Sequence, residues 1–315
     1  MLRGLAALSV CWYHMTISYP AGSIIKSVSK FGWLGVEVFF VLSGFIIPYI
    51  LFLSGYKLRN NFGKFILKRL IRLYPPYIIA VILVLILWHL SAITPGFKGV
   101  NPEYSSAQVL LHLGYLNDIF DYPWFNPVFW TLAIEFQYYI LISLIFPLVV
   151  CKKDYYRRIG MIILCLLPVI AEAKAFVFSY LGLFSLGILT FQYFSKLISS
   201  REYLILYILA SASLFMTFGT LIALLGMATA LVIGFLKINV NRVFIFLGSI
   251  SYSLYLIHVP VGSRAVHLGQ RLVSTEYEYL FISLIGVILS IAFASLFYIY
   301  IEKPSQAWSS KIKYK

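Results

Sequence analysis

Long apolar runs dominate this sequence, and they constrain its fold more than any other feature. A helix needs about 20 mostly apolar residues to cross a bilayer, and about ten runs of roughly that length follow one another here. Only helices and closed barrels satisfy their backbone in lipid. The pattern therefore predicts an all-α integral membrane protein, a polytopic bundle of about ten transmembrane helices. The predicted spans are residues 2–20, 33–54, 74–94, 128–150, 158–174, 176–195, 203–218, 221–236, 243–263 and 279–301.

The composition agrees with lipid as the main solvent of the chain. Hydrophobic residues make up 61% of it and charged residues 11%, whereas a soluble domain carries about 25% charged residues. The mean hydropathy is +0.91. The formal net charge of +14 does not indicate a nucleic-acid partner, because the basic residues are spread over short loops. The cysteines, Cys11, Cys151 and Cys165, are too scattered for a disulfide framework or a metal site.

Lysines and arginines are unevenly distributed over the connecting segments, and this bias predicts the orientation. With both termini in the cytoplasm, most of the basic residues fall on the cytoplasmic side. The opposite orientation would invert the ratio, so we expect cytoplasmic termini. The basic residues left on the outer side are Lys26, Lys30, Lys98, Lys174, Arg264 and Arg271.

Three ionisable residues inside the predicted spans indicate function, because such groups are costly in a bilayer. They are His14, Glu37 and Glu135. Eleven residues separate Arg3 from His14. At ~100° per residue, both therefore lie on one face of the first helix, ~16 Å apart along its axis. Glu135 enters its span from the outer side to a depth of ~10 Å and could meet His14, whereas Glu37 lies shallower, at ~6 Å.

A histidine beside a carboxylate is a familiar general base, because the carboxylate fixes the tautomer and stabilises the imidazolium. We therefore interpret His14 and Glu135 as candidate catalytic residues. The alternative is that both are packing residues with satisfied hydrogen bonds, and Glu37 could simply reach water. For His258, near the outer end of the ninth span, we expect a structural hydrogen bond to a neighbouring helix, with a second catalytic role as the alternative.

A basic amphipathic segment, residues 55–73, lies between the second and third predicted spans. Lys64, Lys68 and Arg72 recur at four-residue spacing with Arg69 beside them, and apolar residues fill the other side. The pattern predicts a cytoplasmic interfacial helix. It is either an anchor on anionic lipid or a platform for a phosphate-bearing donor, since arginine pairs bidentately with phosphate.

One connecting segment, residues 95–127, is long and is predicted to lie on the extracytoplasmic side. It holds several prolines, acidic residues and tyrosines together with Trp124. A loop of this length in a compact protein is usually functional or disordered. We expect a partly ordered lid at the membrane interface. His112, within this loop, shows no partner pattern.

Six short motifs follow one another along nearly the whole chain. Together, and in this order, they resemble membrane acyltransferase family 3, whose bacterial members O-acylate cell-surface glycans. The spacing of Arg3 and His14 looks like that family's Arg-x10-His motif. The motifs are Arg3-Gly-Leu-Ala-Ala-Leu with His14; Gly35-Val36-Glu37 with Phe39-Phe40-Val41-Leu42-Ser43-Gly44-Phe45; Arg69-Leu-Ile-Arg72-Leu-Tyr-Pro75; Trp130-Thr131-Leu132-Ala133-Ile134-Glu135; Ile250-Ser251-Tyr252 through His258; and Glu302-Lys303-Pro304.

The resemblance implies one membrane acyltransferase domain over residues 1–315, in the inner cell membrane. It implies transfer of an acyl group, usually acetyl, from cytosolic acyl-CoA to a hydroxyl of a cell-surface or lipid-linked saccharide. Acyl-CoA would be a co-substrate, with no bound cofactor and no metal, and membrane lipids would be the other partners. The implied site residues are His14 as catalytic base with Glu135 assisting; Arg3, Arg69 and Arg72 for the donor; and Glu37, Ser43 and His258 in support.

The chain departs from the family pattern at its ends. Relatives usually carry a short leader with Asp-Gly upstream of the arginine, so we expect an incomplete N-terminus or a misassigned start. Some relatives fuse an esterase-like domain after the last span, so this chain would act alone or with an extracytoplasmic partner protein. The rival interpretation is a proton-coupled transporter or flippase of a lipid-linked sugar. Against it, the spans lack the paired Gly/Pro-broken helices of such transporters.

Overall fold

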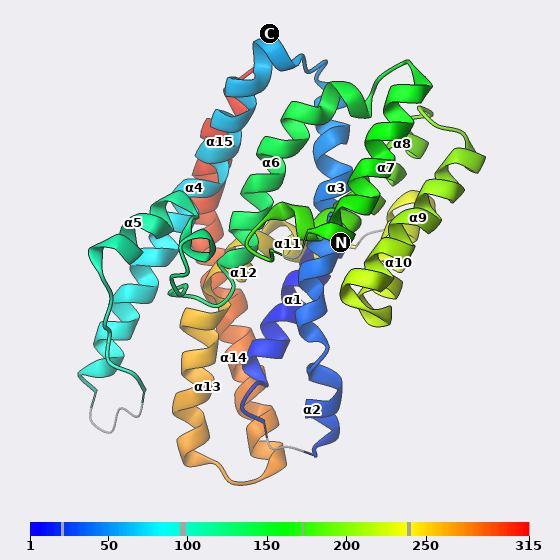
Figure 1. Ribbon diagram of the computed structural model, residues 1–315. Helices are drawn as coiled ribbons and strands as arrows, with labels where there is room; N and C mark the ends of the chain where they lie inside the picture. Colours follow the sequence, from blue (N-terminus) through cyan, green and yellow to red (C-terminus); the bar gives the residue numbers. More distant parts are fainter. Residues whose placement is uncertain (20–21, 95–98, 172, 238–240, 315) are drawn as a thin grey trace. The chain divides into compact units, whose positions relative to one another are not determined.

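A computed structural model describes residues 1–19, 22–94, 99–171, 173–237 and 241–314, and within these ranges all regular structure is helical (Figure 1). Short 3₁₀ or π segments, labelled η, connect or extend several α-helices. The helices are α1 (Leu2–Met15), α2 (Ile24–Ser29), α3 (Gly35–Leu53), α4 (Leu58–Ala92), α5 (Ser106–Gly114), α6 (Trp130–Val149), α7 (Asp154–Ile170), α8 (Leu181–Phe194), α9 (Ser200–Phe218), α10 (Thr220–Phe235), α11 (Arg242–Ser249), α12 (Ser251–Ile257), α13 (Arg264–Gly269), α14 (Glu276–Phe297) and α15 (Lys303–Ser310); the short segments are η1 (Gly32–Leu34), η2 (Asn117–Ile119), η3 (Val177–Tyr180), η4 (His258–Ser263), η5 (Gln270–Leu272) and η6 (Tyr298–Glu302).

Each of the ten predicted spans contains a helix among its described residues, which confirms the predicted all-helical fold. Fewer of them are long and apolar enough to cross a bilayer by themselves. Among the described residues six helical segments meet both criteria, or seven if the bent pair Arg242–Ser249 and Ser251–Leu272 counts as one span. Helices α1, α7 and α10 are shorter, with 14, 17 and 16 residues. Ten spans and the orientation of the termini stay predictions. The six segments are Ile24–Leu53, Leu58–Ala92, Trp130–Val149, Val177–Phe194, Ser200–Phe218 and Glu276–Ser310.

The basic segment predicted at residues 55–73 is not separate from the following span. Helix α4 runs unbroken for 35 residues through Pro75 and Pro76. Prolines in a helix interior remove backbone donors and usually kink or end the helix. The Tyr252 hydroxyl of α12 donates to the Leu73 carbonyl oxygen at 2.9 Å, so a side chain supplies a donor beside the two prolines.

The chain divides into two compact units, each described here by itself. Unit 1 comprises Met1–Gly35, Arg69–Ala133 and Asn241–Lys311. Unit 2 comprises Val36–Lys68, Ile134–Val240 and Ile312–Lys315. The chain passes from one unit to the other within α3, α4 and α6.

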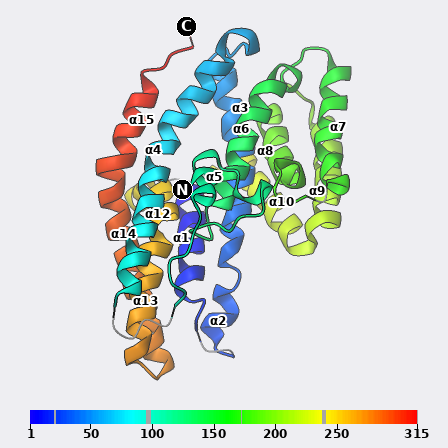
Figure 2. The same ribbon diagram turned by 60° about the vertical axis from the view of Figure 1, so that its left-hand side comes forward.

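Helix α1 lies inside unit 1, in contact with η1, α11, α12, α14 and η4. Both ribbon views show it beside α12 and α14 (Figures 1 and 2). Small residues allow these close contacts: a Cβ on Gly35 would collide with the Ala6 carbonyl oxygen, and one on Gly32 with that of Ser9. Ala7 on α1 is fully buried. The sequence of α1 therefore fixes the depth at which its polar residues lie within the unit.

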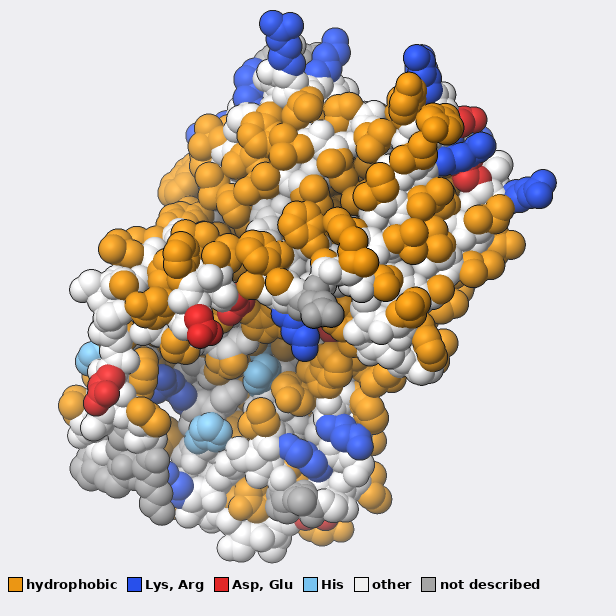
Figure 3. All heavy atoms as spheres, viewed as in Figure 1, with side chains coloured by type: hydrophobic (Ala, Val, Ile, Leu, Met, Phe, Trp, Pro, Cys, Tyr) orange, Lys and Arg blue, Asp and Glu red, His pale blue; other side chains and the backbone are white. Residues whose placement is uncertain are grey.

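In unit 2, helices α7 to α10 pack against one another around α8, most of whose residues are buried. The α3 part of the unit touches α8 through glycines. A Cβ on Gly44 would collide with the Phe184 carbonyl oxygen, and one on Gly187 with that of Val41. This reciprocal contact resembles the small-residue interfaces of membrane helices. Hydrophobic side chains cover much of the visible face over α7, α9 and α10 (Figure 3).

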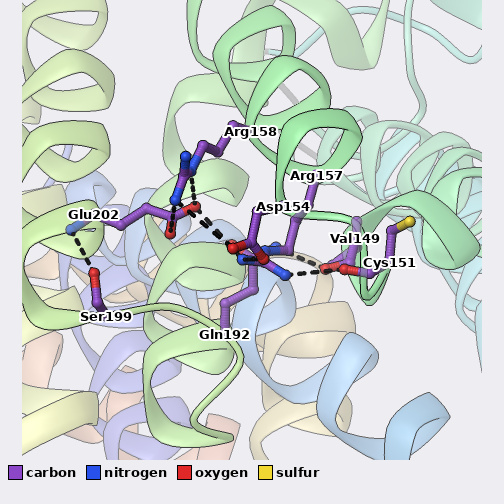
Figure 4. A network of polar contacts seen from close by, with 8 residues as sticks. All are labelled: Val149, Cys151, Asp154, Arg157, Arg158, Gln192, Ser199 and Glu202. Atoms are coloured by element: carbon purple, nitrogen blue, oxygen red, sulfur yellow. Dashed lines mark hydrogen bonds and ion pairs between the residues drawn. The ribbon is translucent and has the colours of Figure 1, made fainter.

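An ion-pair cluster joins the start of α7 to the start of α9 in unit 2 (Figure 4). The Arg157 guanidinium donates to Asp154 at 2.7 Å and to the Cys151 carbonyl oxygen at 2.9 Å. Arg158 pairs with Glu202 at 3.1 Å. Arg157 is 5% exposed, so these two arginines hold helices together as well as contributing to the basic bias of the loops.

Candidate active site

Helix α1 carries both Arg3 and His14, as predicted from their spacing. The helix begins at Leu2 and ends at Met15, so Arg3 lies in its first turn and His14 in its last. At ~1.5 Å per residue the two Cα atoms are ~16 Å apart along the axis. The Thr16 hydroxyl donates to the Trp12 carbonyl oxygen at 2.8 Å and so caps the end of the helix beside His14.

His14 lies against His258, with 5.1 Å between the two ring centroids. His258 follows α12 and opens the π segment η4, and its side chain is fully buried. π segments are rare and are frequent at functional sites. Both histidines belong to unit 1. The structure therefore brings together two residues that the sequence analysis had not paired.

The hydrogen bonds of His258 define its tautomer. Nδ1 lies 2.9 Å from the carbonyl oxygen of Leu254. A carbonyl oxygen can only accept, so Nδ1 carries the proton and Nε2 of the neutral ring carries a lone pair. Nε2 is buried and has no hydrogen-bond partner among the described residues. It is thus an available acceptor next to His14.

A buried carboxylate, Glu302 of η6, lies at the Arg3 end of the same unit. Its Oε2 accepts hydrogen bonds from the Ser253 N–H at 3.1 Å and from the Ser253 hydroxyl. Its Oε1 accepts from the Gln306 amide at 2.8 Å. The charges of Arg3 and Arg72 also act on this carboxylate. Glu302 therefore connects two of the predicted donor-binding arginines to the start of α12.

The predicted donor-binding arginines all belong to unit 1. Arg69 and Arg72 are three residues apart on α4, so they are neighbours on its surface. Arg69 is 7% exposed. The preceding part of the basic segment belongs to unit 2, where Lys68 donates to the Ile312 carbonyl oxygen at 3.3 Å. The segment is therefore divided between the two units at Lys68 and Arg69.

Unit 2 holds the other predicted catalytic residue, Glu135 of α6. Its Oε1 accepts hydrogen bonds from the Ser43 hydroxyl at 2.9 Å and from the Tyr139 hydroxyl. Ser43, predicted to support the site, thus contacts Glu135 directly. Glu37, near the start of α3, is buried, and its Oε2 has no hydrogen-bond partner within the described ranges. Because His14 belongs to unit 1, its pairing with Glu135 stays a prediction.

The long loop is folded over residues 99–127, and it contains α5 and η2; residues 95–98 of the predicted loop lie outside the described ranges. His112 is fully buried, and its Nε2 accepts the Phe125 N–H at 3.0 Å. Its Nδ1 donates to the Gln108 carbonyl oxygen at 2.8 Å. Burial lowers the pKa of His112, and the Gln108 hydrogen bond opposes that shift. His112 therefore organises the loop as a neutral imidazole.

The end of the loop is attached to the helix that precedes His258. The Asn126 amide donates to the Leu256 carbonyl oxygen at 3.1 Å. The hydroxyls of Thr131 and Tyr255 lie 2.7 Å apart. These contacts hold α12 and the loop in one fixed arrangement within unit 1.

The chain matches the acyltransferase domain family over residues 1–299. With motifs, helices and site residues in the order described, the chain belongs to membrane acyltransferase family 3. This confirms the resemblance inferred from the six motifs. No solved structure matches the chain.

Three curated relatives illustrate the family. One is ORF330 of Acidianus two-tailed virus, which is described as an acetyltransferase. It is 28% identical to this chain over an alignment that covers 51% of this chain and 44% of the viral protein. The peptidoglycan O-acetyltransferase OatA of Listeria monocytogenes is 30% identical over 44% of this chain and 22% of its own. The O-acetyltransferase OatA of Staphylococcus aureus is 31% identical over 47% and 24%. The alignments thus span less than half the length of each relative.

Two features of the site differ from what the sequence predicts. Glu302 is part of a sequence motif without a predicted role, although an acidic residue at the end of an apolar span beside basic residues is a signal for a buried charge pair. For His258 the sequence predicts a structural hydrogen bond to a neighbouring helix. The hydrogen bond that the structure gives goes instead to Leu254, four residues earlier in the chain, and Nε2 has no hydrogen-bond partner among the described residues.

Proposed function

We propose that this protein is a membrane O-acyltransferase that moves an acyl group, acetyl by analogy with its relatives, from cytosolic acyl-CoA to a hydroxyl of a cell-surface or lipid-linked saccharide. The observation that carries the proposal is the layout of α1. One helix holds an arginine at one end and a histidine at the other, and each meets a second functional residue in the same unit. Donor binding and proton transfer thus have separate places ~16 Å apart.

Arg3, Arg69 and Arg72 bind the phosphates of the donor in this proposal. A guanidinium matches phosphate with two parallel hydrogen bonds, which a lysine cannot do. The acyl-bearing arm of the donor then extends along the face of α1 toward His14. The charges of Arg3 and Arg72 act on the buried Glu302 carboxylate, and in this proposal that attraction orients the two arginines before the donor arrives. Preorganised charge of this kind lowers the cost of binding.

His14 acts as the general base in this mechanism. It removes the proton of the acceptor hydroxyl while the hydroxyl oxygen attacks the thioester carbonyl. The new ester C–O bond forms and the C–S bond breaks, and the proton passes from His14 to the departing thiolate. Glu135, positioned by Ser43 and Tyr139, assists near the reaction centre. Glu37 supports the same region from the start of α3.

The acceptor approaches from the opposite side of the membrane to the donor. The relatives from Listeria and Staphylococcus are O-acetyltransferases, and one is named for peptidoglycan, which supports a glycan hydroxyl as acceptor. The folded loop at residues 99–127 is rich in aromatic and polar side chains and is suited to bind sugars. We expect a multi-pass protein of the inner cell membrane with cytoplasmic termini, able to work alone or with an extracytoplasmic partner protein.

The test uses purified protein in sealed vesicles of known orientation, with labelled acyl-CoA and an impermeant glycan acceptor. Labelled glycan should form only when the donor is on the face that carries the termini and the acceptor is on the other. Efficient transfer with both substrates confined to one side would contradict this geometry. Movement of a lipid-linked sugar without acyl transfer would instead favour the transporter or flippase.

A further inference from the structure

The position of His258 has no explanation in helix packing alone. Its ring is fully buried. Nδ1 donates a hydrogen bond to the Leu254 carbonyl oxygen, and Nε2 has no hydrogen-bond partner among the described residues. Buried polar atoms are nearly always hydrogen-bonded in native proteins, so each exception needs a reason. The buried His112 of the same unit shows the usual outcome, because both of its nitrogens are engaged.

Of the two ring contacts of His258, the one with His14 is shorter than the one with Tyr255 (6.0 Å between centroids), which makes His14 the candidate donor for this nitrogen. The two ring centroids are 5.1 Å apart and the rings are inclined by 53°. At that separation a small ring rotation brings a His14 N–H to the lone pair of Nε2. The Leu254 carbonyl oxygen prevents the alternative tautomer of His258, because it requires a proton on Nδ1. His258 can therefore only accept from His14.

We infer that His258 is a positioning residue for His14: its Nε2 accepts the N–H of one His14 nitrogen and so directs the lone pair of the other nitrogen at the acceptor hydroxyl. This inference rests on the proposed function, in which His14 is the base. The neutral imidazole of His258 would then orient the catalytic histidine, as a carboxylate does in a Ser-His-Asp triad. A neutral acceptor suits an apolar unit, because it adds no second buried charge.

The surroundings hold His258 where this part requires it. The seven residues of α12 before it are all buried. Glu302 binds the start of that helix at Ser253, and Asn126 binds it near its end at Leu256. A ring fixed from both sides keeps its lone pair in one direction, which is what an orienting group needs.

The experiment compares three variants of His258 in the full-length protein, with His14→Ala as reference. His258→Phe keeps a ring but removes both nitrogens. His258→Gln offers an amide near the position of Nε2, whereas His258→Asn offers one near Nδ1. His89→Phe serves as the matched control, because His89 makes the same bond to the carbonyl oxygen four residues earlier, 2.9 Å to Leu85, but lies exposed.

We expect His258→Phe to lower kcat by roughly 10–100-fold, the usual cost of removing a group that orients a functional side chain. KM for acyl-CoA should stay within about twofold, since the donor phosphates bind elsewhere. His258→Gln should recover part of the lost kcat and His258→Asn should not. His89→Phe should behave as wild type. Thermal unfolding and membrane yield are measured for every variant.

Each result bears on one claim. If His14→Ala is inactive but His258→Phe keeps kcat within about threefold of wild type, the inference fails and the proposed function stands. If His14→Ala is active, the proposed function itself fails. Should His258→Phe not fold, the comparison of Gln with Asn decides, and equal activity of those two variants would overturn the inference.

Discussion

Removing the carboxylate of Glu302 should destabilise unit 1 more than any exposed acidic substitution. Glu302 is 4% exposed and accepts three hydrogen bonds, two of them from Ser253 and one from Gln306. Glu302→Ala leaves a buried backbone N–H without its acceptor, at a cost of about 1–3 kcal/mol. It also leaves the charges of Arg3 and Arg72 without the carboxylate that now compensates them.

Breaking a buried charge arrangement by removing one partner costs about 3–5 kcal/mol in total. With about 2–4 °C per kcal/mol for a domain of roughly this size, Tm should fall by about 6–20 °C. Glu302→Gln keeps the shape of the side chain and one acceptor oxygen, so the decrease in the free energy of unfolding should be smaller, about 1–3 kcal/mol. Both values follow from the hydrogen bonds to Ser253 and from the lost charge.

The assay is thermal unfolding of the detergent-solubilised protein, followed by the loss of monodisperse material after heating. Glu103→Ala is the control, because Glu103 is an exposed acidic residue of the loop in the same unit. Exposed substitutions usually change stability by less than about 0.5 kcal/mol. If Glu302→Ala and Glu103→Ala lower Tm equally, the carboxylate does not hold unit 1 together and the reasoning is refuted.

Three further predictions concern chemistry, the donor and pH. His14→Ala should lower kcat by about 10²–10⁴-fold in a folded protein, the usual effect of losing a general base, and activity within about threefold of wild type would contradict the assignment. Arg69→Ala and Arg72→Ala should each weaken acyl-CoA binding by about tenfold or more, and Lys64→Ala far less; equal small effects would indicate a lipid anchor. Burial lowers the pKa of His112 in the folded loop, so as the pH falls the unfolded chain binds a proton at a higher pH than the folded chain does. The stability of the loop should therefore be constant above about pH 6.5 and decrease below it. Limited proteolysis of the loop measures this, and a cleavage rate independent of pH would contradict it.

Much of the helical structure follows from local sequence, because an apolar run in lipid has few alternatives to a helix. The exceptions depend on individual side-chain contacts, which a hydropathy average over a sequence window does not detect. Helix α1 ends at Met15, earlier than predicted, and the Thr16 hydroxyl binds the carbonyl oxygen of Trp12 at this end. The ninth predicted span breaks between α11 and α12 with a bend of 53°. Composition alone does not distinguish a broken span from a straight one.

The candidate site was predictable in part. Arg3 and His14 share a helix, so their spacing was sufficient to relate them. Ser43 and Glu135 lie on different helices. The ionisable side chain of Glu135 inside a predicted span indicated function, whereas Ser43 was expected at the site only from the family motifs. The contact of His14 with His258 joins opposite ends of the chain, and no local pattern encodes such a contact. A buried acceptor without a partner is visible only once the structure places its neighbours.

Unit 1 is discontinuous in sequence, and this has a consequence for how the protein is made. Its three segments include the beginning, an early middle part and the last helices of the chain. The ribosome releases the His14 helix into the membrane long before it has synthesised His258 or Glu302. Until then, α1 lies in the bilayer while its arginine and its histidine lack their final neighbours. A nascent chain arrested before Asn241 would contain most of unit 2 but no assembled histidine pair. We expect such a truncated product to be inactive and to be degraded by membrane proteases. Two separately expressed fragments, divided at the junction before Asn241, should regain the pair when they meet in the same membrane.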